Sequence, residues 1–486
     1  MGRTDQGEME KSLPLFEAAM QQIAFDPADA KAALAQLPTS AAVFALCFDG
    51  VPTDRSWSVG QGAEAHAEPY IGRTPNLRGR LERLLQPSAK HPRRLQLAGR
   101  VRQIRWRLSG SEFESLLAQF SLLEKIYGAK SLERMHLGAP AFIRFLGSNA
   151  YPRIVVTNRP SQREADWAYG PFQSRAAAER YAEEALKLFL LRRCTEDLDP
   201  NPSHPGCVYS EMKMCLAPCY KGCTDERYGE EAAAVERFLA TRGESKLVTL
   251  RTQRDEASAS LEFETAAALH AQVARVEGVR ALAPELVRPL SLLRAVILQV
   301  SANPGEVAVF LYENGRLSGP AGFLTLGMRI QNEQSGSTSL FAHPMAIEAI
   351  PEETGNREQG SGISKGETAA ADAMPEPTAT EASYAGIAPA ETSEEARAAL
   401  SAKAARGVLE ARMEAALAAL VEPSETPSAM LRQGHLALLK RWYYRPEAKR
   451  TGEIFFPDAE GNWPVKAMLR GVGRVFSTRF KPSTAE

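Results

Sequence analysis

The stretch that decides how this chain is organised is CTEDLDPNPSHPGCVYSEMKMCLAPCYKGC, residues 194–223. It holds five of the six cysteines of the chain: Cys194, Cys207, Cys215, Cys219 and Cys223. Twelve, seven and three residues separate the first four. The stretch has few hydrophobic residues, and four prolines interrupt regular structure. Because packing alone gives such a segment little rigidity, thiolates bound to a metal are expected to stabilise it.

The cysteine spacing leaves two kinds of metal site open. A cysteine cluster in a long chain without a secretion signal indicates a metal site rather than a disulfide framework. Four thiolates can bind a tetrahedral zinc ion or an iron–sulfur cluster. Zinc sites favour paired Cys-x-x-Cys knuckles, and this segment has none. The spacing therefore favours an iron–sulfur cluster, with zinc as the alternative and scattered buried thiols as a third reading.

The charge distribution indicates a polyanionic partner. Residues 73–107 contain eleven Lys or Arg and one acid, whereas the whole chain has a net charge of −1. Residues 331–430 carry six basic and sixteen acidic residues, and residues 440–481 carry ten basic and four acidic residues. Two basic regions separated by an acidic one are typical of a chain that binds nucleic acid. A solvated charged face is the other explanation.

Targeting signals are not seen in the sequence. No apolar run reaches the roughly 20 residues that span a bilayer, and residues 1–10 are polar with no apolar run after them. We therefore expect no membrane contact and a reducing, cytoplasmic location.

The fold class expected is a multidomain α/β protein, because 486 residues exceed what one hydrophobic core organises. Composition and hydrophobic period place the boundaries. The expected parts are a helical N-terminal lead (1–36), a small α/β domain (37–130), a cysteine-rich domain (131–245), a helical hairpin (246–285), a short β-meander (286–330), a disordered acidic linker (331–400), and a C-terminal helix with a small basic segment (401–486).

Local patterns predict the elements of these parts. Strands are expected at 41–48, 69–72, 101–108 and 151–157, and helices at 11–25, 28–37, 76–86, 111–127 and 396–420. Ser111 stands three residues before Glu114, as in a capping box. Residues 225–243 read as one helix ending at Gly243, and residues 247–279 as two helices joined near 261–263. Asn314-Gly315 predicts a tight turn within a meander at 295–326.

Several stretches together resemble the UvrC excinuclease family of bacterial nucleotide excision repair, whose work belongs to the SOS response. AVF (42–44) and PYIGRTPNLRGRL (69–81) resemble its GIY-YIG nuclease signature. YGPF (169–172) and KLFLLRRC (187–194) resemble the run that leads into its cysteine segment. LEFETAAALHAQV (261–273) resembles its UVR motif, a helical hairpin that binds the excinuclease protein UvrB. The resemblance covers residues 37–325, in the family's order.

The resemblance implies roles for particular residues. The cysteines at 194, 207, 215 and 219 match the ligands of a 4Fe-4S cluster, while Cys223 has no family counterpart. On the hairpin, the residues implied to contact the partner are Leu261, Phe263, Ala267 and Leu269. In the basic tract, the residues implied to bind DNA are Arg73, Arg78, Arg80, Arg83, Arg93 and Arg94.

Hydrolysis of a phosphodiester needs a divalent metal, a base for water and a cation for the developing charge. By resemblance, Tyr70 is the YIG tyrosine, Arg73 takes the usual lysine position and Arg80 meets the phosphate. A tyrosine of the family is replaced by Phe44, a second one by Leu84, and the metal-binding glutamate by Gln119. An amide lacks the charge with which a single carboxylate binds Mg²⁺. We therefore expect an impaired site that needs Mg²⁺ if it is active at all.

Other acids are poor replacements for the missing glutamate. Glu114 and Glu124 lie about 140° around the predicted helix from Gln119, and Glu112 lies on its face but roughly 10 Å away along the axis. The family also continues into a second, RNase H-like nuclease and helix-hairpin-helix units, where this chain carries an acidic tract. The favoured hypothesis is a DNA-binding repair component that docks UvrB without cutting. The alternatives are an active single-incision endonuclease, directed by DNA structure or lesion, and an iron–sulfur redox sensor.

Overall fold

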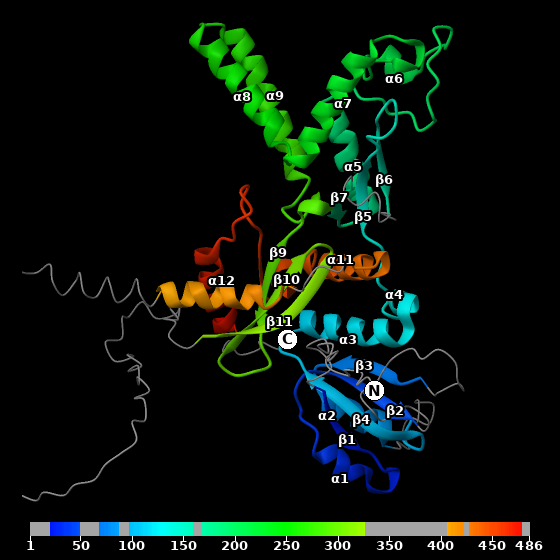
Figure 1. Ribbon diagram of the computed structural model, residues 1–486, viewed down its shortest axis with the longest axis vertical. Coiled ribbons are helices and arrows are strands. Elements are labelled where there is room, and N and C mark those ends of the chain that lie inside the picture. The colour runs from blue at the N-terminus through cyan, green and yellow to red at the C-terminus, as the bar shows by residue number, and fades with distance from the viewer. Residues whose placement is uncertain are drawn as a thin grey trace, which may run out of the picture. The chain divides into compact units, whose positions relative to one another are not determined.

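A computed structural model describes residues 20–48, 68–86, 97–158, 168–325, 406–421 and 427–478. The chain divides into two units, one formed by Met1–Leu326 with Arg412–Glu486 and the other by Gly327–Ala411. In the second unit residues 406–411 are described, and they are helical. The described residues of the first unit form three four-stranded sheets (Figure 1).

The first sheet is antiparallel throughout, in the order β1-β4-β2-β3. Its strands are β1 (Gln21–Ala24), β2 (Ala42–Phe48), β3 (Tyr70–Thr74) and β4 (Val101–Leu108). Strand β2 is apolar along its whole length because both of its faces are covered. Helices α1 (Ala30–Ala35) and α2 (Leu77–Leu85) pack on one face, and α3 (Glu112–Tyr127) packs on the other.

The N-terminal prediction is wrong in one part. Residues 11–25 were expected to be helical, but Gln21–Ala24 form strand β1, in which Ile23 pairs with Ile104 of β4. Pairing with a strand eighty residues away overrides the weak local preference of this polar run. Residues 1–19 lie outside the described part of the chain. The strands expected at 41–48, 69–72 and 101–108 and the helices expected at 28–37, 76–86 and 111–127 are confirmed, with shorter bounds for some.

The second sheet has the order β6-β5-β7-β8. Its strands are β5 (Ala141–Phe145), β6 (Ile154–Thr157), β7 (Ala168–Phe172) and β8 (Arg288–Pro289). The strand expected at 151–157 is the shorter β6, whereas β5, β7 and β8 were not predicted. Helices α5 (Arg175–Leu186) and α7 (Asp225–Ala240) share the core of this sheet. The side chain of Ser174 begins α5 by accepting the amide of Ala177.

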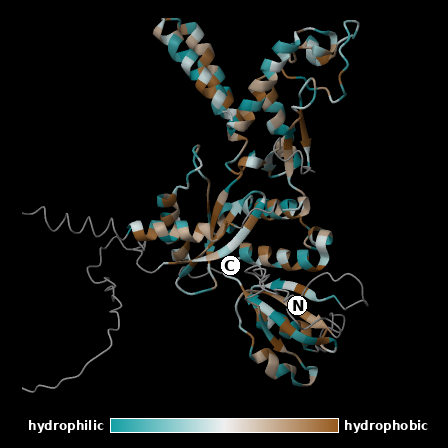
Figure 2. Ribbon diagram, viewed as in Figure 1, coloured by the Kyte–Doolittle hydropathy of each residue, from teal (hydrophilic) through white to brown (hydrophobic). Residues whose placement is uncertain are grey.

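The predicted helical hairpin is present. Helix α7 ends before Gly243, whose φ of 84° suits glycine, and α8 (Glu244–Ala259) follows. A turn with Leu261 at φ 60° leads into α9 (Phe263–Ala281). The two helices bury a short apolar seam between them and are otherwise a mixture of hydrophilic and hydrophobic residues (Figure 2).

The third sheet joins the predicted meander to the end of the chain, in the order β11-β10-β9-β12. The meander strands are β9 (Ala295–Val300), β10 (Glu306–Glu313) and β11 (Arg316–Leu324), and both Asn314 and Gly315 have positive φ at the predicted turn. The expected basic segment supplies α11 (Ala429–Tyr443), β12 (Glu453–Phe455) and α12 (Val465–Thr478). Residues 406–418 of the helix expected at 396–420 are helical, and the acidic linker 331–400 lies outside the described residues.

Helix α3 has two packed faces. Ala118 and Leu122 contact the first sheet, while Phe113 and Phe120 belong to a core that contains β9, β10 and α11. A Cβ atom on Gly434 of α11 would lie 2.1 Å from Cζ of Phe120, so the close approach of the two helices requires glycine there. The first sheet and the third sheet therefore share α3 as a common wall. In the residues that the structure describes, no helix is long and apolar enough to cross a membrane.

Candidate nuclease-like site and cysteine segment

Phe44 fills the core beside the YIG strand. Its side chain is 1% exposed, and its ring lies over Gly72, where a Cβ would come within 2.7 Å of Cζ of Phe44. Tyr70 lies on the same face, with its ring centroid 6.1 Å from that of Phe44. Leu84 of α2 packs against the same core. Core packing, one of the roles open to Phe44, is the role that the structure shows.

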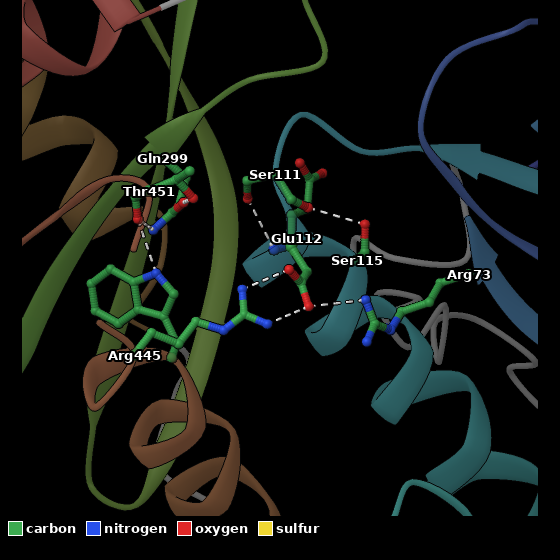
Figure 3. Close-up of polar contacts among 9 residues, drawn as sticks. Arg73, Ser111, Glu112, Ser115, Gln299, Arg445 and Thr451 are labelled. Carbon is green, nitrogen blue, oxygen red and sulfur yellow. Dashed lines mark hydrogen bonds and ion pairs between the residues drawn. The ribbon is translucent and has the colours of Figure 1, made fainter. Parts of the chain in front are cut away.

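Arg73 lies on the opposite face, toward α3, because successive side chains of a strand alternate. Its Nη1 atom is 3.2 Å from Oε1 of Glu112 at the start of α3 (Figure 3). Arg445, which follows α11, donates to the same carboxylate from two nitrogens, at 2.6 and 2.7 Å. The hydrogen bond from Arg445 is the main cause that lowers the pKa of Glu112, and the charge of Arg73 adds to it. Arg73 is therefore held by an ion pair.

The other arginines of the tract differ in how they are used. Arg78 donates from Nε to the carbonyl of Leu37 at 2.7 Å, and Arg83 donates from Nε to the carbonyl of Gly79 at 2.9 Å. The side chain of Arg80 on α2 is half-buried and has no hydrogen bond or ion pair with any described residue. Arg93 and Arg94 lie outside the described residues. Among the described arginines that the sequence implied for DNA binding, Arg80 thus differs from Arg73, Arg78 and Arg83, each of which has a partner.

The acids near Gln119 are occupied by structural contacts. Gln119 is half-buried on α3, two turns from Glu112, which bridges two arginines. Glu114 is buried and accepts the backbone amide of Gly110 at 2.8 Å, while Arg107 lies 3.7 Å away. Burial raises the pKa of Glu114, and the amide of Gly110 and then Arg107 act in the opposite direction. The capping box is half formed, because Ser111 accepts the amide of Glu114 while the carboxylate of Glu114 turns to Gly110.

The residues implied to be catalytic are therefore divided between two faces of the first sheet. Phe44 and Tyr70 lie on the face that α1 and α2 cover, whereas Arg73 points toward α3, the helix that carries Gln119. Within the described ranges, no three His, Cys, Asp or Glu side chains come together as ligands of a single metal ion.

The cysteine segment is built from tight turns. Cys207 precedes the one-turn helix α6 (Val208–Glu211), and Cys219 lies in the 3₁₀ turn Pro218–Tyr220. Three residues that are not glycine, Lys213, Ala217 and Lys221, have positive φ, which side chains rarely adopt. The segment is tied to its surroundings by backbone hydrogen bonds, such as that from Leu216 to Leu190 at 3.0 Å.

The four family cysteines influence one another electrostatically. Burial is the main cause that raises the pKa of Cys215 to about 11, and the neighbouring thiols of Cys194, Cys207 and Cys219 add to it. The backbone amide of Ala217 donates to the sulfur of Cys215 at 3.2 Å. Arg192 Nη1 lies 3.5 Å from the sulfur of Cys194. Amide and guanidinium donors of this kind stabilise thiolates, as the sulfur ligands of a cluster require.

The sulfurs of Cys194, Cys207 and Cys219 lie near enough to Cys215 to influence its pKa. Four thiols gathered in this way suit a metal site with thiolate ligands. Cys223 stands apart from this set, since the charges that act on it are Asp225 and Arg227.

The tip of the hairpin exposes apolar residues. Leu261 is 71% exposed and Phe263 is 67% exposed, although both side chains are hydrophobic. Ala267 is exposed and Leu269 is half-buried on the same helix. Of the four residues that the sequence implied for partner contact, Leu261, Phe263 and Ala267 are exposed near the tip, whereas Leu269 packs against the core that contains Val273.

Two functional residues were missed in the sequence. Glu112 was considered only as a possible metal ligand, and Arg445 was not considered at all. They are 333 positions apart, so no local pattern could join them. The one available signal was the position of Glu112 in the first turn of α3, where a carboxylate is favourable.

Comparison with known proteins gives matches over part of the chain. Residues 142–238 match the family described as the UvrC/Cho excinuclease, middle domain. The UvrABC system protein C of Alcanivorax borkumensis is 29% identical over 211 residues, covering 43% of this chain and 34% of that protein. The proteins of the same name from Ruminiclostridium cellulolyticum and Symbiobacterium thermophilum are each 27% identical over 293 residues. These two alignments cover 58% of this chain, with 47% and 45% of the relatives.

The chain thus spans between about a third and a half of the length of these relatives. No solved structure matches it.

Proposed function

Because the chain is a divergent member of the UvrC family, we propose that it is a component of bacterial nucleotide excision repair. We propose further that its first domain, which contains the first sheet and helices α1 to α3, binds DNA and does not cut it. The observation that carries the proposal is the ion pair of Arg73 with Glu112, in which Arg445 also takes part. An arginine that neutralises a carboxylate of its own chain is a weak ligand for a phosphate. Glu112, held by two arginines, is likewise a weak ligand for a metal ion.

The rest of the first domain supports this function. Phe44 has no hydroxyl and is enclosed in the core, so it cannot relay a proton to or from water. Gln119 offers a neutral amide where a metal-binding carboxylate would be needed. Arg80, in contrast, keeps a guanidinium without a partner among the described residues. The domain retains a phosphate contact and loses the groups that would activate water.

A cleavage assay tests this function. The full chain is incubated with lesion-bearing plasmid and with branched DNA in Mg²⁺ or Mn²⁺, and binding to the same DNA is measured by fluorescence anisotropy. We expect no nicking, together with sequence-independent binding that weakens with salt. The Arg80→Ala variant should bind less tightly than the parent, while Arg175→Ala, which removes an exposed charge paired with Glu179, should not. Robust nicking by the parent that Arg80→Ala abolishes would establish the active endonuclease instead.

The hairpin α8–α9 is the proposed contact for the excinuclease protein UvrB. A helical pair with a thin apolar seam binds a matching pair by placing exposed apolar residues against it. Leu261 and Phe263 at the tip provide such residues, and both belong to the stretch that resembles the family's UVR motif. The predicted partner is therefore a helical hairpin with a complementary apolar face.

The cysteine segment is the proposed site of an iron–sulfur cluster. Cys194, Cys207, Cys215 and Cys219 would hold it, and the amide of Ala217 would stabilise the thiolate at position 215. When bound, the cluster would cross-link turns that contain few hydrophobic residues. Anaerobically purified protein should absorb near 400 nm, and Cys215→Ala should bleach and destabilise it, whereas Cys223→Ala should not. Colourless protein with one zinc per chain would contradict the cluster.

A further inference from the structure

A pocket lies where the base of the hairpin meets the second sheet, and neither the cysteines nor the residues of the nuclease-like site line it. Its volume is about 290 Å³. The residues that line it are Tyr169, Tyr181, Arg242, Glu277, Arg280, Ala281 and Ala283. We refer to it as the tyrosine–arginine pocket. It draws its walls from four elements, because the tyrosines come from β7 and α5 and the arginines from the turn before α8 and from α9.

Two buried tyrosines form the floor of the tyrosine–arginine pocket. Tyr169 is 2% exposed and Tyr181 is 0% exposed, and their ring centroids lie 5.6 Å apart with the ring planes tilted by 30°. The two hydroxyls interact with each other, and Tyr169 also with Arg242, but neither has a hydrogen bond of regular geometry among the described residues. A buried hydroxyl without such a bond lowers stability, since it has lost its water. Both hydroxyls line a cavity, so a ligand in the cavity would satisfy them.

The arginines leave positive charge unmatched. The Nε atom of Arg242 is buried and has no hydrogen-bond partner of regular geometry among the described residues. None of the described carboxylates forms an ion pair with Arg242. Arg280 is paired with Glu244 at 2.9 Å. Glu277, the one carboxylate of the lining, is paired with Arg251 at 2.8 Å. Glu244 and Glu277 are thus already paired with other arginines, and the charge of Arg242 is not matched by a carboxylate.

Two further effects favour an anion. Burial lowers the pKa of nearby Arg288, and repulsion by Arg242 adds to the effect, as expected where positive charges gather. Burial raises the pKa of Tyr169 and of Tyr181, so both phenols keep their protons at neutral pH and remain hydrogen-bond donors. One phenol can donate to the other, so the donors that the pocket offers a ligand are a tyrosine O–H group and guanidinium N–H groups.

We propose that the tyrosine–arginine pocket binds a phosphate-type oxyanion, held mainly by Arg242, whose charge no carboxylate matches, and contacted by the tyrosine hydroxyls. A guanidinium presents paired N–H donors that match the oxygens of a phosphate, and such charge-assisted bonds are the strong ones. The volume is at the small end for ligand pockets, which suits a phosphate or a phosphate carried on a small group. The phosphate can belong to a free molecule or to the end or backbone of a DNA strand.

Binding here would couple two parts of the first unit. The hydroxyls belong to the second sheet and its helix α5, whereas the guanidiniums belong to the hairpin and the turn that starts it. An oxyanion between them would hold the base of the hairpin against the sheet. The pocket would thus sense a phosphate and set how firmly the partner-binding hairpin is anchored.

The test uses the full chain and measures thermal unfolding and calorimetric titration. The ligands are inorganic phosphate, pyrophosphate, and a short single-stranded oligonucleotide with and without a 5′-phosphate, all at equal ionic strength against chloride. The variants are Arg242→Gln, Tyr181→Phe and Tyr169→Phe, and the matched control is Arg237→Gln, which removes an exposed charge from the last turn of α7. A ligand that binds the native state raises the unfolding temperature.

We expect at least one phosphate ligand to bind the parent and Arg237→Gln equally. Arg242→Gln should weaken that binding by about tenfold or more, and each Tyr→Phe variant by a smaller factor. A response to phosphate or pyrophosphate alone assigns a free ligand, and one that requires the 5′-phosphate assigns a strand end. A parent that binds none of the ligands, or Arg242→Gln and Tyr→Phe variants that respond as the parent does, would overturn the proposal. General salt stabilisation would raise all proteins equally and so would also count against it.

Discussion

At the scale of single residues, Glu112 is the point at which the nuclease-like domain is tied to the end of the chain. Its carboxylate receives Arg73 from β3 and two bonds from Arg445. We expect Glu112→Gln and Arg445→Gln each to lower the unfolding temperature slightly, because partly exposed ion pairs contribute roughly 0.2–1 kcal/mol, with more for bidentate geometry.

The double variant measures the coupling between the two residues. If they act through one contact, Glu112→Gln/Arg445→Gln should cost less than the sum of the single changes. Glu179→Gln, which breaks an exposed pair with Arg175, is the control that should leave stability nearly unchanged. Additive effects of the two single changes would show that the bidentate contact contributes nothing in solution.

His435 predicts how stability depends on pH. It is buried in α11 and accepts the amide of Leu317 through Nδ1 at 3.0 Å. Burial lowers its pKa to about 3, and Arg316 contributes in the same direction. The unfolded chain therefore takes up a proton near pH 6.5, well before the folded chain does. The stability that the buried, neutral His435 contributes is present above pH 6.5 and is lost as the pH falls toward 3. The free energy of unfolding decreases over this range by up to about 1.4 kcal/mol per pH unit.

Replacement of His435 removes this dependence. His435→Asn keeps an acceptor but no titrating group, so its stability curve should be flatter between about pH 6.5 and 3 than that of the parent. Chemical unfolding at several pH values measures the difference, and His270→Asn, at an exposed position of α9, serves as the control. Parallel curves for His435→Asn and the parent would mean that His435 titrates normally in the folded protein.

At the scale of elements, the contact of α3 with α11 depends on one glycine. Gly434→Ala would place a Cβ atom 2.1 Å from the Phe120 ring, and both helices would have to shift. Overpacking of this kind costs about 1–3 kcal/mol. Thermal unfolding should show a lower midpoint for Gly434→Ala. Gly473→Ala on α12, where a Cβ meets no atom within 4 Å, should be neutral or stabilising.

A second substitution tests the cause. Phe120→Leu shortens the side chain that the new methyl group meets, so Gly434→Ala/Phe120→Leu should lose less stability than the sum of the two single changes. A double variant that loses the full sum would place the damage elsewhere in α11.

The exposed tip of the hairpin can be tested for its proposed contact with UvrB. Phe263→Asp places a charge among the exposed apolar residues of the tip and should abolish capture of UvrB, because a buried unpaired charge is costly at an interface. The hairpin itself should still fold, since its buried seam, which includes Val273 and Val276, is untouched. Val408→Asp changes an exposed valine outside the hairpin and is the control. Capture by Phe263→Asp at the level of the parent would remove the tip as the contact.

The sequence predicted the elements whose signals are local. The apolar run of β2, the period of α3, the Asn314-Gly315 turn and the hairpin of α8 and α9 are all confirmed. Elements defined by distant partners were missed or misread. β1 is a polar four-residue strand that exists because β4 pairs with it, and β12 is three residues long and depends on β9.

The candidate site was predictable to the same degree. The sequence indicated which residue types stand at the nuclease positions, and Phe44 is in the core, one of the roles it allowed. It did not indicate that Arg73 and Phe44 lie on opposite faces, nor that the partner of Glu112 comes from residue 445. The tyrosine–arginine pocket joins residues 169, 181, 242 and 280, which share no motif.

At the scale of the whole molecule, the first unit is formed by two stretches of chain, up to Leu326 and from Arg412 onward. They meet at several places, including the α3–α11 contact, the Arg445–Glu112 ion pair and the hydrogen bond from Tyr444 to the carbonyl of Pro171. A domain boundary drawn at residue 130 would separate α3 from the core that it shares with β9, β10 and α11. Residues 37–130 expressed alone should therefore aggregate. Co-expression with residues 427–478 should make them more stable.

The pairing in the third sheet predicts how the protein behaves when its chain is cut between the two segments. β12 pairs with β9 although about 150 residues separate the two strands in the sequence. A protease site engineered at residues 359–364 should yield two pieces that co-elute in gel filtration and separate only in denaturant. The two halves, co-expressed as separate genes, should likewise reassemble. By this reasoning the continuity of the peptide chain between residues 326 and 412 is dispensable for the first unit, and its two segments behave as the two halves of a heterodimer that happen to be translated together.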